Sequence, residues 1–195
     1  MLLFFSSCKD DNDNLVPIEY DPEVVPTLTT HNVSTLISDS GVTRYKIIAD
    51  VWKVFDKAKE PYWYFPEGIY VERFTPDFNV EATIKADTAW YFNEKNLWRA
   101  KNNVFVENMQ GDQFESDELF WDQKNGRVFS DNYIEIRRGN NTQIKGYGFE
   151  SNQQFTDYKI FRAHDGKFPF VDRPIPSDTL LQTGSNTIEP DSFNK

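Results

Sequence analysis

The sequence predicts an all-β domain, and three observations support that fold class. Runs rich in Val, Ile, Phe, Tyr, Trp and Thr follow one another between Val42 and Phe170, and short polar segments separate them. Four of these segments have the composition of hairpin turns, namely 93–96, 108–112, 124–126 and 139–141. A four-residue pattern recurs five times in one register along these runs. Together these observations predict antiparallel hairpins stacked around an apolar interior.

The composition is that of one domain with extensions. The chain has 195 residues, of which 38% are hydrophobic and 16% aromatic, so it can bury a substantial core. Its formal net charge of -10 offers no basic surface for phosphate chains, which argues against nucleic acid as a partner. A single cysteine excludes an internal disulfide and a cysteine-based zinc site, and two histidines leave little for metal chemistry. No cofactor or metal is therefore expected.

The first residues resemble the end of a bacterial lipoprotein signal. The apolar segment 1–5 is too short to span a bilayer and is followed by Ser6, Ser7 and Cys8, the residue that would carry the lipid. Residues 1–8 are then a truncated signal, and the protein is held to a membrane by its lipid. The alternative is that Cys8 is a free thiol in a disordered terminus.

Polar segments that contain several prolines flank the predicted domain. Residues 9–26 are expected to form a flexible tether, and residues 171–195 a disordered tail, because neither has the apolar content for a core. The β domain is thus expected over residues 27–170. Lys9-Asp10-Asp11 also resembles a signal that sends some lipoproteins to the cell surface, which keeps that location open as an alternative.

Alternation along the runs supports strands. From Arg127 to Arg138 one parity is mainly apolar or small, as expected for a strand with one dry face. That parity contains Val128, Ser130, Ile134 and Ile136. Only Lys46–Lys59 competes as a helix, and its β-branched and aromatic residues favour a strand.

Each copy of the repeated pattern reads apolar, any residue, small, Asp or Asn. The five copies are Ile47–Asp50, Ile84–Asp87, Phe114–Asp117, Val128–Asp131 and Phe149–Asn152. The apolar and small residues of a copy share one face of a strand, whereas the acid or amide points to the other face, where it can bond a neighbouring turn. Stacked copies predict a layered β scaffold with a line of small residues inside.

The order and spacing of four segments resemble the LptC family, within the wider group of lipopolysaccharide-transport jellyrolls that includes LptA and the OstA domain. The segments are Ser40–Ala49, Ile84–Ala89, Glu118–Asp131 and Ile144–Phe149, and the resemblance extends over about residues 29–165. It implies an open-ended, V-shaped antiparallel β-jellyroll whose two sheets enclose an apolar slit for the acyl chains of lipid A. The sequence departs from many members in its anchor, because it offers the truncated lipobox at Cys8 where they have a transmembrane helix.

The resemblance also implies partners and a location. Family members take lipopolysaccharide from an inner-membrane ABC transporter and pass it to an LptA-like protein, the next jellyroll of a periplasmic bridge. The expected location is the periplasmic face of the inner membrane, with the outer membrane or cell surface as the alternative. The chain has no nucleotide-binding motif, so the energy for transport must come from the transporter.

Apolar residues on successive strands are the candidates for the slit. An acyl chain needs only a dry groove, since each buried methylene contributes about 0.8 kcal/mol without directional chemistry. The candidates are Ile47, Ala49, Phe65, Ile84, Ala86, Trp90, Val104, Val106, Leu119, Val128, Ile134, Ile136, Ile144 and Phe149. The alternative is that these residues form a closed core.

Four residues are candidates for partner contacts. Gly41 matches a family glycine beside which a second backbone can pass, although an ordinary turn glycine is the alternative. Tyr64 aligns with a family segment associated with lipid or transporter contact, although packing beside prolines is the alternative. Tyr158 and Ile160 lie in the C-terminal edge, about residues 155–164, which is expected to meet the next subunit by strand addition. The N-terminal edge, about residues 27–37, is expected to meet the transporter.

Other functions fit the sequence less well. A glycosidase would need two converging carboxylates, and the acids here lie on turns and polar strand faces, so an enzyme is not expected. Those acids are Asp117, Glu118, Asp122, Asp131 and Glu135. The stronger alternative is a surface glycan-binding module that stacks sugars on exposed tryptophans. The candidates are Trp63, Trp90, Trp98 and Trp121. A structural adaptor of the cell envelope is the third possibility.

Overall fold

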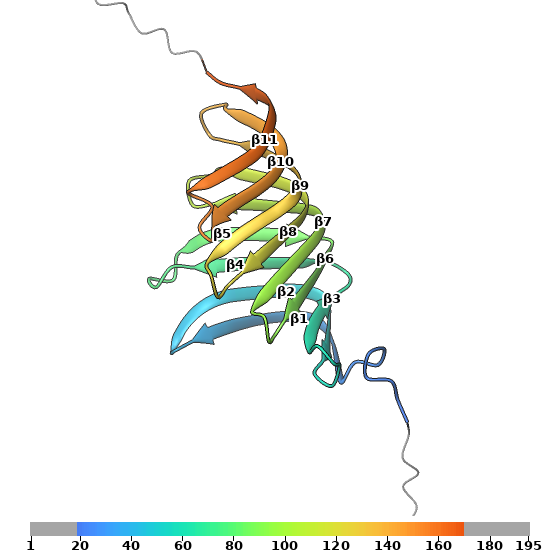
Figure 1. Cartoon of the computed structure of the whole chain (residues 1–195). Coiled ribbons are helices and arrows are strands. Elements are labelled where there is room, and N and C mark those ends of the chain that lie inside the picture. Colours follow the sequence, from blue (N-terminus) through green and yellow to red (C-terminus); the bar gives the residue numbers. More distant parts are fainter. Residues whose placement is uncertain (1–18, 170–195) are drawn as a thin grey trace, which may run out of the picture.

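The protein is all-β in the computed structural model, which describes residues 19–169 (Figure 1). The strands are β1 (Leu28–Asp39), β2 (Val42–Phe55), β3 (Tyr62–Phe65), β4 (Ile69–Phe74), β5 (Val80–Ala86), β6 (Thr88–Phe92), β7 (Leu97–Asn108), β8 (Gln113–Asp122), β9 (Arg127–Arg137), β10 (Gln143–Asn152) and β11 (Tyr158–Lys167). The described residues contain no helix, and the segment with helix as an alternative lies mostly in β2. The predicted fold class is therefore confirmed, and the four predicted hairpin turns fall between consecutive strands.

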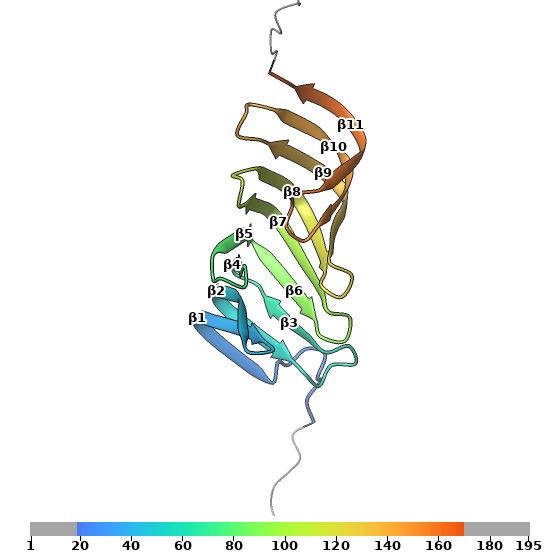
Figure 2. The ribbon, with the colours of Figure 1, turned by 90° about the vertical axis from the view of Figure 1, so that its left-hand side faces the viewer.

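All eleven strands belong to one antiparallel sheet that folds into two walls. β2 pairs with β4 through residues 45–48 and with β3 through residues 53–55. β7 likewise pairs with β6 through residues 97–101 and with β5 through residues 105–108. We call the wall with β4 and β5 the first wall, and the wall with β3 and β6 the second wall. The hairpins from β7 to β11 continue both walls, so the strands stack from β1 to β11 along one axis as an antiparallel β-jellyroll (Figure 2).

The long strands pass from one wall to the other at a corner where the ladder is irregular. Between β7 and β8 the register shifts from Lys101 to Val104, and Asn102 and Asn103 have φ of 62° and 48°. Asparagine tolerates this left-handed conformation because its short side chain can bond locally. Asp87 separates β5 from β6 at the same corner, where its carboxylate accepts from Asn103 Nδ2 at 2.7 Å. The polar residues of the corner thus bond one another where the strand ladder is interrupted.

The corner also changes which side chains face inward. In β5 the inward residues are Ile84 and Ala86, whereas in β6 Ala89 is the buried residue of the interior cluster. Inward positions therefore have even numbers in β5 and odd numbers in β6. One residue added at a bend reverses the alternation of every side chain that follows.

The repeated pattern has its apolar and small residues on the inward face, as predicted. The expectation that the fourth residue bonds a neighbouring turn holds for Asn152, whose side chain accepts from the Thr156 N–H at 3.0 Å, whereas Asp87 bonds Asn103 within β7. Within the described residues no side-chain hydrogen bond is made by Asp50, Asp117 or Asp131. In the Phe114–Asp117 copy the small residue makes the hydrogen bond instead, since Ser116 Oγ donates to the Tyr133 carbonyl at 2.7 Å.

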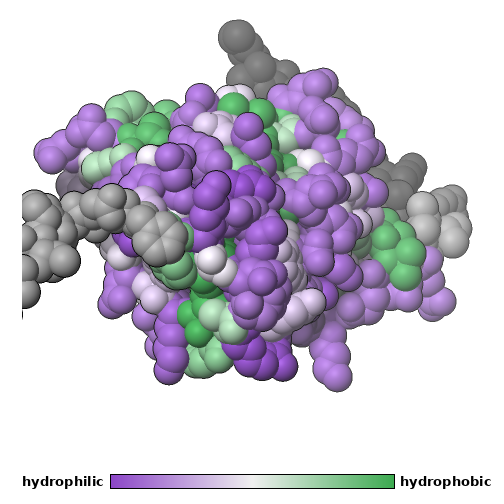
Figure 3. Space-filling model, turned by 90° about the horizontal axis from the view of Figure 1, so that it is seen from above, coloured by the Kyte–Doolittle hydropathy of each residue, from purple (hydrophilic) through white to green (hydrophobic). Residues whose placement is uncertain are grey.

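Both ends of the stack are open edges, because β1 pairs only with β2 and β11 only with β10. Seen from the β11 end, the surface is mostly hydrophilic with separate hydrophobic patches (Figure 3). At the other end, residues 19–26 contact the domain through Glu23, whose carboxylate accepts from the Lys59 N–H at 2.5 Å. The predicted lipidation residue Cys8, the rest of the tether and the tail 171–195 lie outside the described residues.

Candidate functional site

The interior between the two walls is one continuous apolar cluster. Twelve of the fourteen residues predicted for the slit lie in it or pack against it. They are Ile47, Ala49, Phe65, Ile84, Ala86, Val104, Val106, Leu119, Val128, Ile134, Ile136 and Phe149. They come from seven strands in both walls, β2, β3, β5 and β7 to β10, so the cluster runs along most of the stack. The structure therefore brings most of the predicted set together on one inward surface.

Trp90 is a correction, because it lies on the outer face. Its cross-strand partner Tyr64 stacks on it with ring centroids 5.2 Å apart, and the Arg99 guanidinium lies over its ring at 5.3 Å. The prediction continued the even-numbered alternation of β5 into β6, and the bend at Asp87 reverses that alternation. Ile144 lies across from buried Ile136 on the inward face but is only half-buried and outside the cluster.

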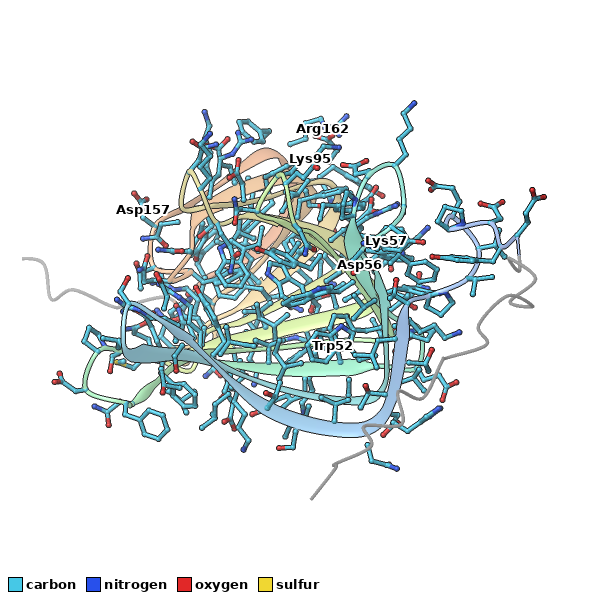
Figure 4. The ribbon with its side chains drawn as sticks, turned by 90° about the horizontal axis from the view of Figure 1, so that it is seen from below. Trp52, Asp56, Lys57, Lys95, Asp157 and Arg162 are labelled. Carbon is cyan, nitrogen blue, oxygen red and sulfur yellow. The ribbon has the colours of Figure 1, made fainter. Side chains whose placement is uncertain are left out.

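The interior between the two walls is closed in this conformation. A wholly apolar cavity of about 40 Å³ remains between the walls, far below the roughly 300–1,000 Å³ of ordinary ligand pockets. Its lining comprises Ile69, Val71, Ile84, Ala89, Trp98, Ala100, Leu119, Trp121, Val128 and Phe155. Side chains fill the space between the walls, and Trp52 lies inside the arc of β1 (Figure 4). An acyl chain can enter only if the two walls separate.

Phe155 closes the interior from the turn between β10 and β11. It is 1% exposed, and its ring lies 5.1 Å from that of Phe114 of β8. Its carbonyl accepts from Asn108 Nδ2 at 2.9 Å, which ties this turn to the end of β7. The neighbouring Gln153 carbonyl accepts from Arg73 Nη1 of β4 at 3.1 Å. The turn therefore bridges the free margins of the two walls, and separation of the walls must break these contacts.

Phe155 was expected at the start of the C-terminal edge and not in the interior, but it lies in the turn before β11, where strand alternation gives no signal. Its φ of 57° is unusual for a bulky side chain. The packing around the ring and the bond from Asn108 hold it in place. Only contacts distant in sequence reveal its role.

Three indole N–H groups in the interior lack a hydrogen-bond partner within the described residues. They belong to Trp52, Trp98 and Trp121, and in each the nitrogen atom is buried. A buried donor without a partner costs about 1–3 kcal/mol. Such groups are rare in folded proteins, and residues 19–169 supply no acceptor for these three.

The tryptophans do not form an exposed platform for sugars. Trp63, Trp98 and Trp121 pack in or against the apolar interior, and only Trp90 lies on the outer face. Trp63 and Trp98 meet at an interplanar angle of 76°, not as coplanar rings. The arrangement that a glycan-binding surface requires is therefore missing from this set.

Three of the five acidic residues considered for catalysis, Glu118, Asp122 and Glu135, are held by structural partners. Glu118 accepts from Arg99 Nε at 2.7 Å, and Asp122 accepts from Asn125 within the β8–β9 turn. The hydrogen bonds from Asn125 hold the pKa of Asp122 below its usual value. Among residues 19–169, no group of three or more His, Cys, Asp or Glu side chains is placed to hold a metal ion.

Glu135 lies in a charged cluster on the outer face of β9. Arg137 Nη2 lies 2.6 Å and Lys145 Nζ 3.4 Å from its carboxylate, and Gln143 Nε2 donates to it at 2.6 Å. Burial raises the pKa of Glu135, but the hydrogen bond from Gln143 and the two cations outweigh it. The pKa therefore lies below its usual value.

The residues predicted for partner contacts are spread over the fold. Gly41 occupies the β1–β2 turn with a φ of 81°, and an added Cβ would meet nothing within 4 Å, so the turn alone accounts for this glycine. Tyr64 lies on the outer face, stacked on Trp90. Tyr158 and Ile160 lie in the edge strand β11, but their side chains pack against the interior. A role in partner binding stays a prediction for all four.

The described residues include no helix that is long and apolar enough to cross a membrane. A comparison with known protein families matches residues 4–160 to the family described as "Lipopolysaccharide-assembly, LptC-related". No curated protein matches the sequence.

Proposed function

The chain belongs to the LptC-related family of lipopolysaccharide-assembly proteins, and from this premise we propose that its slit carries the acyl chains of lipopolysaccharide. Membership makes the protein a component of lipopolysaccharide transport and assembly on the periplasmic side of the export system. The observation that supports the slit is the continuous apolar cluster, to which both walls contribute. Each methylene moved into it gains about 0.8 kcal/mol, and the sum over several acyl chains is the driving force that would act against the cost of separating the walls.

In the proposed pathway the protein receives lipopolysaccharide from an inner-membrane ABC transporter and passes it to an LptA-like jellyroll. The open edges support partner binding at both ends, since an unpaired strand can add a strand of another protein without particular side chains. We assign β1 to the transporter side and β11 to the bridge side. A photo-crosslinking amino acid at exposed Leu36 of β1 and at exposed Phe161 of β11 tests this assignment. The two positions should capture different partners, and capture of one protein by both would refute it.

The proposed anchor is a lipid on Cys8 that holds the protein at the inner membrane. The Cys8→Ala variant should lose incorporation of labelled fatty acid and move from the membrane to the soluble periplasmic fraction. Labelling that persists in this variant would refute the assignment of the lipid to Cys8.

The acyl slit is tested by crosslinking at two tryptophans of adjacent strands. Trp98 lines the apolar cavity, whereas Trp90 lies on the outer face one strand away. A photo-crosslinking phenylalanine analogue at each position replaces one aromatic side chain by another, which limits the disturbance. In cells, adducts that a lipopolysaccharide antibody recognises should form at Trp98 and not at Trp90. Equal adducts at both positions, or none at Trp98 in a folded protein, would overturn the proposal.

A further inference from the structure

A second and larger cavity opens between the free margins of the two walls, opposite the corner. Its volume is about 680 Å³, within the range of ordinary ligand pockets. The first wall contributes Arg44, Tyr45 and Arg73 to its lining, and the second wall contributes Trp63, Tyr91 and Lys124. We call this cavity the mouth. It is the place where a ligand can contact both margins at once.

Positive charge gathers at the mouth of a chain whose net charge is -10. Arg44, Arg73 and Lys124 line the cavity, against a single acid, Asp39. Arg73 is partly neutralised by Glu81, whose carboxylate lies 2.5 Å from Nη1. Within residues 19–169, Arg44 and Lys124 have no carboxylate closer than 4.0 Å. Two free cations that face one cavity from opposite walls suit a ligand with more than one anionic group.

Aromatic rings connect the mouth with the apolar slit. Trp63 and Tyr91 line the mouth with ring centroids 4.9 Å apart, and Tyr91 stacks at 4.8 Å on Trp98, which lines the apolar cavity. Tyr45 of the mouth meets Trp121 of the apolar cavity edge to face at 5.3 Å. These contacts form an unbroken path of aromatic rings between the two cavities. A ligand with a sugar head and acyl chains would therefore pass from the mouth into the slit without leaving aromatic contact.

The two tryptophans at this junction are among the three whose indole N–H groups lack an acceptor. The indole N–H groups of Trp98 and Trp121 have no partner within the described residues, and Trp121 is only 7% exposed. Pure hydrocarbon cannot satisfy such donors. Ester and amide carbonyls can, and in an acylated sugar they lie between the head and the chains.

We propose that the mouth binds the phosphorylated sugar head of an acylated glycolipid, with Arg44 and Lys124 on the phosphates and the Trp98 and Trp121 indoles on the acyl carbonyls. This inference rests on the proposed function, whose slit would hold the chains. The sugar head then binds outside the slit. The mouth makes binding selective for phosphorylated lipids, whereas the apolar slit cannot distinguish them.

The test compares two probes that differ only in the head. Purified lipid A with two phosphates and lipid A from which both phosphates have been removed are titrated against the full chain. The Arg44→Gln/Lys124→Gln variant should lose about tenfold in affinity for phosphorylated lipid A and keep its affinity for the dephosphorylated form. The matched control Lys57→Gln/Lys101→Gln removes two exposed positive charges elsewhere and should change neither affinity. Added salt should weaken only the binding of phosphorylated lipid.

Replacing Trp121 by Phe tests the second contact, because this change keeps an aromatic ring and removes the N–H. The affinity for both lipid forms should fall by about fivefold, since both retain their acyl carbonyls. The melting temperature should stay the same or rise, because the unpaired donor is gone. Unchanged affinity for both lipids would remove the indole from the proposal.

The outcomes separate this inference from the proposed function. If the wild type binds both lipid forms and the Arg44→Gln/Lys124→Gln variant does so with the same affinities, the head site is wrong while the slit stands. If the wild type binds neither form, the slit and the head site both fail. Binding of the phosphorylated form alone would support the head site and refute an apolar slit. Inorganic phosphate should not displace lipid A at equal concentration, and displacement would identify a site for free phosphate.

Discussion

Replacement of Phe155 by Ala is the sharpest test of how the slit is closed. The ring is buried to 1%, packs against Phe114 and Phe149, and lines the apolar cavity. Loss of its burial removes about 2 kcal/mol of transfer free energy, and the void left behind adds about 1–2 kcal/mol. The free energy of unfolding should thus fall by about 3–4 kcal/mol, measured by urea denaturation. The matched control Phe161→Ala removes a ring that is 53% exposed and should change stability by less than about 0.5 kcal/mol.

The void in the Phe155→Ala variant joins the apolar cavity, so an acyl chain should fill it. A single-chain neutral detergent below its critical micelle concentration should raise the melting temperature of the variant more than that of the wild type. At a free concentration one hundred times its dissociation constant, it would restore about 2.7 kcal/mol. A loss of less than about 1 kcal/mol on substitution, or equal effects of detergent on both proteins, would refute the idea that this ring fills the slit.

Two further predictions concern the outer parts of the fold. A Cβ on Gly146 would lie 2.6 Å from the Arg162 carbonyl, so Gly146→Ala should release β11 and speed amide exchange there, whereas Gly139→Ala, with nothing within 4 Å, should not. Exchange unchanged in Gly146→Ala would contradict this packing. The pKa of Glu135 lies below its unfolded value of 4.5, so its contribution to stability is complete above pH 4.5 and is lost as the pH falls through the folded pKa. Glu135→Gln should therefore lower stability at pH 7 by about 1 kcal/mol and flatten its fall as the pH drops below 4.5. Parallel pH curves for the two proteins would contradict the assignment.

Much of the architecture could be predicted from the sequence because its causes are local. Alternation with period two reports which strand face is dry, and the Asn- and Gly-containing turns report where the chain reverses. Val128 and Ile134 are buried for this reason, and the turn at 124–126 joins β8 to β9 as expected. The order and spacing of the segments also indicated the family that the comparison shows.

The candidate site could be predicted only in part. Twelve of the fourteen proposed slit residues lie in or against the apolar cluster, because alternation within one strand predicts which face is inward. The prediction for Trp90 was wrong because alternation does not continue across a bend. The sequence does not show how many residues at the bend, here Asp87, are left out of the strand pairing. The outward face of Trp90 became clear only from its pairing with Tyr64.

Local residue patterns predict the all-β class, the four hairpin turns, the inward parity of most strands and the family. The tertiary structure alone decided how the two walls meet, because that depends on contacts between residues far apart in the chain. Phe155 reaches Asn108 across 47 positions, and Arg73 reaches Gln153 across 80. The mouth is lined in the same way, since Arg44 and Lys124 belong to different walls. Local patterns do not predict these pairs of residues, because the two members come together only when both walls are folded.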